Sequence, residues 1–283
     1  MMLLDFNQVC ISSLMAQLGN HTDVDLDEGI LRHMILNSIR SIKSKFPDHG
    51  ELVICCDAKH VWRKQIFPYY KANRKKAREE SEIDWVQIFN ILNKIRDEIK
   101  TNFPYRVIQV EGAEADDVIG TLAIKYGQML NTGEKILILS GDKDFVQLQV
   151  FGNVQQYDPT RKKYVKQDDP IKFTRELILK GDRGDGIPNI LSNDDVLVKN
   201  ERQRPIRTEK YANVQNPREF FTGEMLRNWV RNEQLIDLTF IPEDIQNKVI
   251  EEFQTEENKP RDKMFNYFIQ HKLKMLMEHI GEF

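Results

Sequence analysis

The stretch YRVIQVEGAEADDVIGTLAIKYGQML, residues 105–130, contains the repeating unit of the fold. Its first six residues are largely apolar and β-branched, which predicts a buried strand, and the run from residue 114 predicts a helix. Strand-like runs of the same kind recur at 2–6, 51–57, 135–140 and 154–158, and further helix-like runs at 26–46 and 84–103. This alternation predicts an α/β fold with a doubly wound, mostly parallel sheet, flanking helices and right-handed crossovers.

The composition supports a globular protein. The chain has 283 residues, 40% of them hydrophobic, which is enough to bury a large core. No apolar run approaches the roughly 20 residues of a membrane span. The first ten residues lack a basic leader and carry Asp5, so we predict a first strand and not a signal peptide. Cys10, Cys55 and Cys56 have no zinc-type spacing and are expected to be buried free thiols in a reducing cytoplasm.

After about Gly186 the pattern changes. Residues 200–220 are polar, basic and weakly periodic, which predicts a loop, and helical runs follow at 223–238, 242–253 and 262–277. A turn and a small hairpin are predicted at 157–165. We therefore expect an α/β core over 1–185 and a helical region over 186–283 packed on it.

Acidic residues follow the carboxyl ends of four predicted strands and occupy one later loop. They are Asp5, Asp57, Glu114, Asp116, Asp117, Asp142, Asp144, Asp182 and Asp185. In a parallel sheet these strand ends form one ligand-binding edge. Carboxylates gathered there repel one another, so we expect divalent cations. Oxygen donors alone favour Mg²⁺ or Mn²⁺, and so many acids suit two or three ions.

Each acidic segment also has a simpler interpretation as a helix start, a turn or a surface loop. This simpler interpretation does not suit Asp5 and Asp57. A carboxylate at the end of a strand that is buried on both faces costs folding free energy unless it has a partner. Without these nine acids the rest of the chain has a formal charge of +6, compared with −3 for the whole chain. A mildly basic body around an acidic pocket suits a polyanionic substrate.

A basic arm follows the second strand, over about 59–82. From Lys59 to Arg78 there are eight Lys or Arg and no acids. Lys71, Arg74, Lys75 and Arg78 would form one stripe if the segment is helical. Aromatic residues lie just upstream, either free to stack on unpaired bases or packed on the body: Trp62, Phe67, Tyr69 and Tyr70. A solvated charged helix is the alternative for the stripe.

Several motifs stand in a characteristic order: LLDFNQ, VICCDA, YYKANRKKAREE, EADD, SGDKDFVQL and LKGDRGDGIP. The ordered set resembles the 5′-nuclease superfamily, the flap endonuclease and 5′→3′ exonuclease group with a PIN-like core. LIDLTFIP and the terminal GEF resemble its branch in T-even-like bacteriophages, known as ribonuclease H. The resemblance therefore spans nearly the whole chain.

The resemblance implies roles for individual residues. The first metal cluster would contain Asp5, Asp57, Glu114, Asp116, Asp117 and Asp142, and the second Asp144, Asp182 and Asp185 with Asp142 nearby. Asp116 and Asp142 would be central to catalysis. Lys71 would contact the scissile phosphate beside Arg74, and the arm, with Tyr70, Lys75 and Arg78, would form an arch for a 5′ single strand.

The resemblance also implies substrates and partners. Metal-dependent 5′→3′ exonuclease and flap endonuclease activity is expected on flaps, nicks and RNA-primed duplexes, in a monomer that removes primers in phage replication in the host cytoplasm. A phage single-stranded-DNA-binding protein would dock on the C-terminal helices through Phe265, Phe268, Leu273 and Leu276. These four side chains are alternatively core residues.

Residues 182–211 correspond to the family's helix-hairpin-helix-like element, which holds duplex DNA and often K⁺. Here no glycine lies between Gly186 and Gly223, which puts the K⁺ site in doubt. Duplex binding then falls to a basic loop, with simple flexibility as its alternative: Arg202, Arg204, Arg207 and Lys210.

Two other functions compete with this interpretation. A nucleic-acid-binding module that lost its chemistry would lack several of the acids, and all are present. A phosphohydrolase for small substrates would carry DxDx[TV] at the first strand, where this chain has LLDFNQ.

Overall fold

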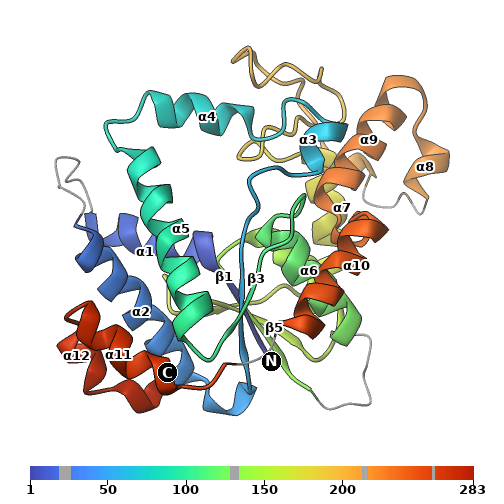
Figure 1. Cartoon of the computed structure of the whole chain (residues 1–283). Helices are drawn as coiled ribbons and strands as arrows, with labels where there is room; N and C mark the ends of the chain where they lie inside the picture. The colour runs from blue at the N-terminus through green and yellow to red at the C-terminus, as the bar shows by residue number, and fades with distance from the viewer. Residues whose placement is uncertain (19–26, 128–133, 212–213, 215, 257–258) are drawn as a thin grey trace.

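The computed structural model describes residues 1–283 except 19–26, 128–133, 212–213, 215 and 257–258. Its centre is a six-stranded sheet of order β3-β2-β1-β4-β5-β6 (Figure 1). The first five strands are parallel, and β6 pairs antiparallel with β5 as the predicted hairpin. The strands are β1 Met2–Asp5, β2 Leu52–Cys55, β3 Arg106–Ile108, β4 Ile136–Leu139, β5 Val154–Asp158 and β6 Lys163–Val165. The predicted doubly wound, mostly parallel α/β fold is confirmed.

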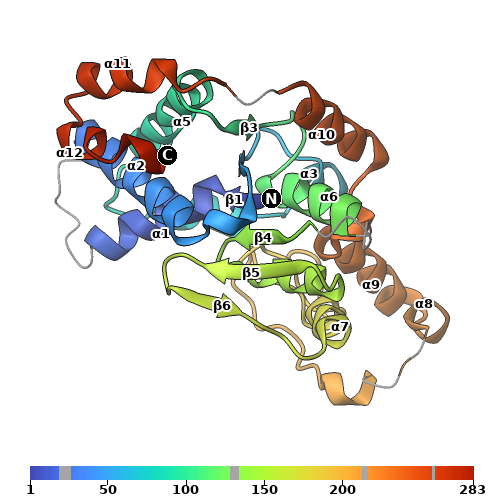
Figure 2. The same cartoon turned by 90° about the horizontal axis from the view of Figure 1, so that it is seen from below.

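Helices cover both faces of the sheet (Figure 2). One face packs against α1 Phe6–Leu18, α2 Glu28–Lys45 and α5 Trp85–Asn102, and the other against α6 Ala115–Gly127 and α10 Glu243–Thr255. Side chains alternate along each strand, so Met2 and Leu4 enter the first core and Leu3 the second. Because both faces are buried, the central strands β1, β2 and β4 are almost entirely apolar, which is why the sequence shows them as continuous apolar runs.

The remaining helices are α3 Arg63–Ile66, α4 Ala72–Glu79, α7 Pro170–Lys180, α8 Pro217–Phe220, α9 Gly223–Ile236, α11 Asp262–Gln270 and α12 Lys274–Met277. Short 3₁₀ segments are η1 Pro47–His49, η2 Lys143–Val150, η3 Thr208–Tyr211, η4 Leu238–Phe240 and η5 Ile280–Glu282. Helices α1 and α7 were not predicted from the sequence. The helix predicted at 262–277 is instead two, because the backbone turns left-handed at Lys272 (φ 55°). The helix predicted from residue 114 was expected to continue to residue 130, and residues 128–130 lie outside the described residues.

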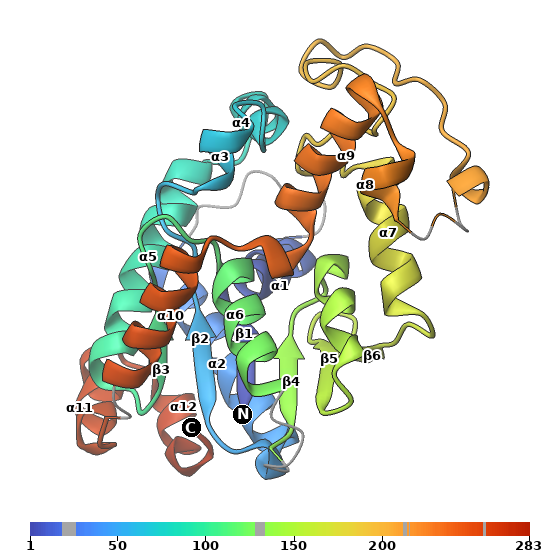
Figure 3. The same cartoon turned by 90° about the vertical axis from the view of Figure 1, so that its right-hand side faces the viewer.

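A third apolar core joins the base of the arm to the C-terminal half. It packs Phe67 and Tyr70 against residues of α7 and α9, including Ile178 and Trp229. Figure 3 shows α3 and α4 above the carboxyl edge of the sheet, with α9 rising beside them. The arm is therefore anchored directly over the edge at which ligands bind in such sheets.

Among the described helices, none has the length and apolar character needed to cross a membrane. All three cysteines are free and buried, as predicted.

Candidate active site

The strand order reverses between β1 and β4, so the chains leaving these two neighbours diverge to opposite faces. Asp5, the last residue of β1, lies at this point with 5% of its surface exposed. Its carboxylate accepts hydrogen bonds from the Gln8 backbone N–H (3.1 Å) and from Ser140 Oγ (3.2 Å). Burial, with the nearby charges of Asp57 and Asp142, raises the pKa of Asp5 to about 7.

Asp57 bridges two helix starts beside Asp5. Its Oδ2 accepts from Asn7 Nδ2 at 2.7 Å, in the first turn of α1. Its Oδ1 accepts from the backbone N–H of Ala115 at 2.8 Å, the first residue of α6. This contact brings the acids that follow β2 and β3 to the same edge.

Asp116 and Asp144 are the least compensated acids of the edge. Burial raises the pKa of Asp116 well above its usual range, and the charges of Asp142 and Asp5 add to this against the attraction of Lys71. Burial and the charge of Asp142 likewise raise the pKa of Asp144. Asp144 Oδ1 is buried and has no hydrogen-bond partner among the described residues. Such carboxylates are costly when ionised and form a natural position for a cation.

Basic side chains neutralise Glu114 and Asp185. Lys71 Nζ lies 2.7 Å from Glu114 Oε1 and 3.6 Å from Asp185 Oδ2, and Arg74 pairs with Asp185. Burial alone would raise the pKa of Glu114, but Lys71 and the buried Arg63 bring it down to about 2.

Asp182 is neutralised in the same way. Lys143 Nζ lies 2.6 Å from Asp182 Oδ2. Burial opposes ionisation of Asp182, but Lys143 lowers its pKa below the usual range. Asp182, like Glu114 and Asp185, is therefore already paired with a basic side chain.

The acids share one edge but do not form a ready-made metal cluster. Within the described part of the chain, no three or more His, Cys, Asp or Glu side chains are arranged to hold a metal ion. The ammonium and guanidinium groups of Lys71, Arg74 and Lys143 occupy carboxylate oxygens instead. Metal binding therefore requires these side chains to move.

Asp117 has three hydrogen-bond donors around one carboxylate oxygen. It is fully buried, and its Oδ2 accepts from the Glu114 backbone N–H (2.9 Å), Trp62 Nε1 (3.0 Å) and Arg63 Nη1 (3.0 Å). The contact with Glu114 is a capping interaction at the start of α6. Asp117 thus shares the Arg63 guanidinium with Glu114.

Arg63 contacts the acids of the site and was not singled out from the sequence. It is 2% exposed, and its Nη1 lies 3.0 Å from Glu114 Oε2. Its Nε donates to the carbonyl of Leu235 on α9 at 2.9 Å. Its membership of a basic segment next to an acidic site is the one signal in the sequence that points to it.

The aromatic residues of the arm are packed on the body. The Tyr70 ring is 2% exposed, and its hydroxyl donates to Glu114 Oε2 (2.9 Å) and lies 3.2 Å from Asp185 Oδ2. Trp62 and Phe67 are also buried. Tyr70 therefore offers no ring face to a base in this conformation, contrary to the nucleic-acid-binding role predicted for it.

The predicted basic stripe divides between two directions. Lys71 and Arg74 turn inward to the acids, whereas the Lys75 side chain is 83% exposed. Arg78 turns toward α5, where its guanidinium carbon lies 4.7 Å from the Phe89 ring centroid. The stripe thus presents two cations to the edge and one to solvent.

The base of the arm docks on the loop 182–186. The Lys71 backbone N–H donates to the Asp185 carbonyl (2.7 Å), and Asn73 Nδ2 donates to the Arg183 carbonyl (2.8 Å). Gly186 has φ +73°, and a Cβ atom there would lie 2.9 Å from the Tyr69 carbonyl oxygen. Only glycine fits this close approach.

Side-chain amides brace the basic loop that follows. Asn189 Nδ2 donates to the Arg204 carbonyl (2.8 Å), and from α9 Asn228 and Asn232 donate to the carbonyls of Ile190 (3.0 Å) and Pro188 (2.9 Å). The four predicted DNA-binding residues of the loop are all exposed: Arg202, Arg204, Arg207 and Lys210. Asn228 and Asn232 of α9 thus hold residues 188–190, and Asn189 in turn holds the backbone of the basic loop at Arg204.

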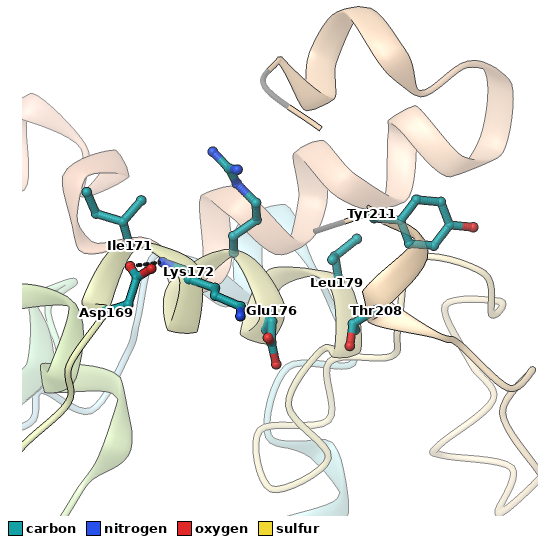
Figure 4. Close-up of a pocket in the computed structure, with 8 residues that line it drawn as sticks. Asp169, Ile171, Lys172, Glu176, Leu179, Thr208 and Tyr211 are labelled. Atoms are coloured by element: carbon teal, nitrogen blue, oxygen red, sulfur yellow. Dashed lines mark hydrogen bonds between the residues drawn. The ribbon is translucent and has the colours of Figure 1, made fainter. Parts of the chain in front are cut away.

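Two other surfaces are remote from the acidic edge. A pocket of about 310 Å³ between α7 and η3 is lined by Lys172, Glu176 and Tyr211 among others, and contains none of the predicted site residues (Figure 4). At the C-terminus, Phe268, Leu273 and Leu276 are buried in the core. Of the four residues predicted to dock a partner protein, Phe265 alone is largely exposed, at 52%.

A doubly wound sheet with acids gathered at its switch point and a basic arm above them defines the PIN-like class of proteins. Comparison with known proteins agrees with this assignment. Residues 1–176 match the family model of the 5′-3′ exonuclease N-terminal resolvase-like domain, and residues 173–283 match the T4 RNase H C-terminal domain. The chain therefore belongs to the 5′→3′ exonuclease family, in the branch with this C-terminal domain, and the resemblance seen in the sequence is confirmed.

Individual relatives support the assignment. Ribonuclease H of Enterobacteria phage T4 is 35% identical over 99% of this chain and 95% of its own length. A 5′-3′ exonuclease of Buchnera aphidicola is 32% identical over 55% of this chain and 53% of its own. The solved structure of the T5 5′-exonuclease with bound zinc shares the fold, with a TM-score of 0.64 at 17% identity over 91% of this chain and 99% of that chain.

Proposed function

We propose that this protein is a metal-dependent 5′ nuclease that cleaves phosphodiester bonds at flaps, nicks and RNA-primed duplexes. The observation that carries the proposal is the set of poorly compensated carboxylates at one sheet edge, Asp5, Asp116 and Asp144, beside the cations Lys71 and Arg74. Family membership supports the same activity, because relatives are named ribonuclease H, 5′-3′ exonuclease and flap endonuclease.

The proposed ligands are the acids of the edge, and the proposed ions are two or three Mg²⁺, for which Mn²⁺ substitutes. Asp5, Asp57, Glu114, Asp116 and Asp142 would hold the first site. Asp144, Asp182 and Asp185 would hold the second, next to Asp142. All donors are oxygen atoms, which suits these hard cations. We assign Asp117 the task of orienting Glu114, and we propose no K⁺ site.

Bound ions would supply an activated water and neutralise charge at the leaving 3′-oxygen. The chain's own cations contribute the rest. When the acids are neutralised, the Lys71 ammonium and the Arg74 guanidinium are free to turn to the phosphate and stabilise the charge that develops there. Their side chains, now 20% and 43% exposed, are accessible from the edge. Lys71 is the better placed, because the left-handed turn at its own residue (φ 56°) aims it at Glu114.

The proposed division of labour follows the chain. Residues 1–185 form the nuclease core, and the arm at 59–82 guides the 5′ single strand with Lys75 and Arg78. Residues 186–283 hold duplex DNA through the exposed cations of the 202–210 loop. We propose a monomer acting in phage replication in the host cytoplasm, with the exposed face around Phe265 available to a single-stranded-DNA-binding protein.

Asp116→Asn and Asp142→Asn test the proposal. Both variants should lose Mg²⁺-dependent cleavage of 5′-labelled flap, nicked and RNA-primed duplexes while they still bind DNA. The exposed Asp168, changed to Asn, provides the matched control and should cleave normally. Cleavage near the wild-type rate in both site variants would refute the assignment. A protein that contacts DNA phosphates binds more weakly as salt rises, and each neutralised phosphate contributes about 0.9 to the slope of log affinity against log salt concentration. DNA binding that does not weaken with salt would therefore favour a phosphohydrolase of small substrates.

A further inference from the structure

Strand β5 carries a glutamine where the interior of the sheet favours an apolar side chain. Gln156 is 1% exposed, whereas its neighbour Gln155 points to solvent. A buried amide is costly unless all its groups find partners. The partners of Gln156 therefore indicate what this residue does.

Both donor contacts of Gln156 go to the loop that leaves β4. Its Nε2 donates to the carbonyl of Ser140 at 3.0 Å and to the carbonyl of Asp142 at 2.6 Å. Its Oε1 accepts from Gln149 Nε2 at 3.3 Å, and the same Gln149 amide donates to the Val165 carbonyl on β6 at 3.2 Å. The hydrogen bond from Gln149 thus fixes the orientation of the Gln156 amide.

The carbonyls that Gln156 holds belong to the segment that positions two acids of the edge. The Asp142 backbone N–H donates to Ser140 Oγ (3.1 Å), and Asp142 Oδ1 accepts from the Asp144 backbone N–H (3.0 Å). Across the loop, Gln8 Oε1 accepts from the Gly141 backbone N–H at 3.3 Å. The segment is clamped between a glutamine of α1 and a glutamine of β5, so a shift at residue 142 displaces both carboxylates.

We propose that Gln156 is a positioning residue of the metal-binding edge. It fixes the backbone of Asp142, and through the cap on Asp144 it sets the distance between the first and the second group of acids. This inference rests on the proposed function, since it concerns the same carboxylates. Residues that orient metal ligands without touching the metal commonly change metal affinity or activity by about 10–100-fold when they are replaced.

The test is a titration of the protein with Mn²⁺ alone, followed by calorimetry, with cleavage of a 5′-flap duplex measured in parallel. Gln156→Met keeps the length of the side chain and removes its amide. Gln155→Met makes the same change at the exposed neighbouring position and is the matched control. We expect the Kd for Mn²⁺ to rise about tenfold in Gln156→Met, with kcat lowered about 10–100-fold, and no change in Gln155→Met.

The other outcomes are also decisive. Wild-type Mn²⁺ affinity and kcat in folded Gln156→Met would overturn the inference and leave the proposed function intact. Failure of the wild-type protein itself to bind Mn²⁺ would overturn both. If Gln156→Met does not fold, Gln149→Met decides, because it removes the group that orients Gln156 and leaves Gln156 in place. An unchanged Kd for Mn²⁺ in Gln149→Met would then overturn the inference, and a raised Kd would support it.

Discussion

Replacing Asp5 by asparagine should stabilise the protein in the absence of metal. The raised pKa of about 7 means that the folded protein holds a proton on Asp5 that the unfolded chain, with an ordinary value of 3.8, releases. At about 1.4 kcal/mol for each tenfold change in proton affinity, ionised Asp5 costs about 4 kcal/mol of unfolding free energy. Asparagine has the same shape, can still accept from the Gln8 N–H and carries no charge.

The sign of the effect fixes its dependence on pH. Below about pH 4 the carboxyl group is protonated in both states, so the wild-type protein and Asp5→Asn should be equally stable. As the pH rises toward 7 the wild-type protein loses stability that the variant keeps, and above 7 the difference should be constant at about 4 kcal/mol. Millimolar Mg²⁺ should narrow the difference, because an ion that binds the native edge stabilises the wild-type protein.

Urea denaturation followed by circular dichroism, in EDTA at pH 4 to 8, measures this difference. Asp168→Asn, at an exposed position, controls for the loss of a negative charge at the surface. Equal unfolding free energies of the wild-type protein and Asp5→Asn at pH 8 would show that Asp5 is not an uncompensated buried acid. If Asp5→Asn is more stable than the wild-type protein and has no cleavage activity, then the charge of Asp5 destabilises the fold and is needed for function.

Three further changes test other parts of the site. Arg63→Met leaves the buried Asp117 without its cation and Glu114 with Lys71 alone, and should lower the unfolding free energy by about 3–5 kcal/mol; a loss below about 1 kcal/mol in urea denaturation contradicts this role. Lys71→Ala and Arg74→Ala should lower kcat by about 10²–10³-fold with little change in Kd for duplex DNA, and equal effects on both would contradict a role at the phosphate. Arg204→Ala combined with Arg207→Ala should reduce the log–log salt slope of duplex binding by about 2, and an unchanged slope would exclude the loop from duplex contacts.

Much of the fold was predictable because its signals are local. Strands buried on both faces, such as β1, β2 and β4, are almost entirely apolar, and all five predicted strand runs are strands of the sheet. The helix α7 was missed although Asp169 and Pro170 form an N-cap and a first-turn proline, a recognisable start signal. The break at Lys272 leaves no such local signal, because it depends on Leu273 and Leu276 reaching the core.

The sequence by itself determined which residues gather at the edge of the sheet, because parallel strands place their carboxyl ends together and acids follow those ends. Only the tertiary structure decided which partner each of these acids has. Arg63 reaches Leu235, 172 positions away, and so turns Asp117 and Glu114 into partners of a buried cation. Contacts between such distant residues are set by packing. Packing therefore decides which acids of the edge gain a basic partner and which, like Asp144, keep a buried oxygen without a hydrogen-bond partner among the described residues.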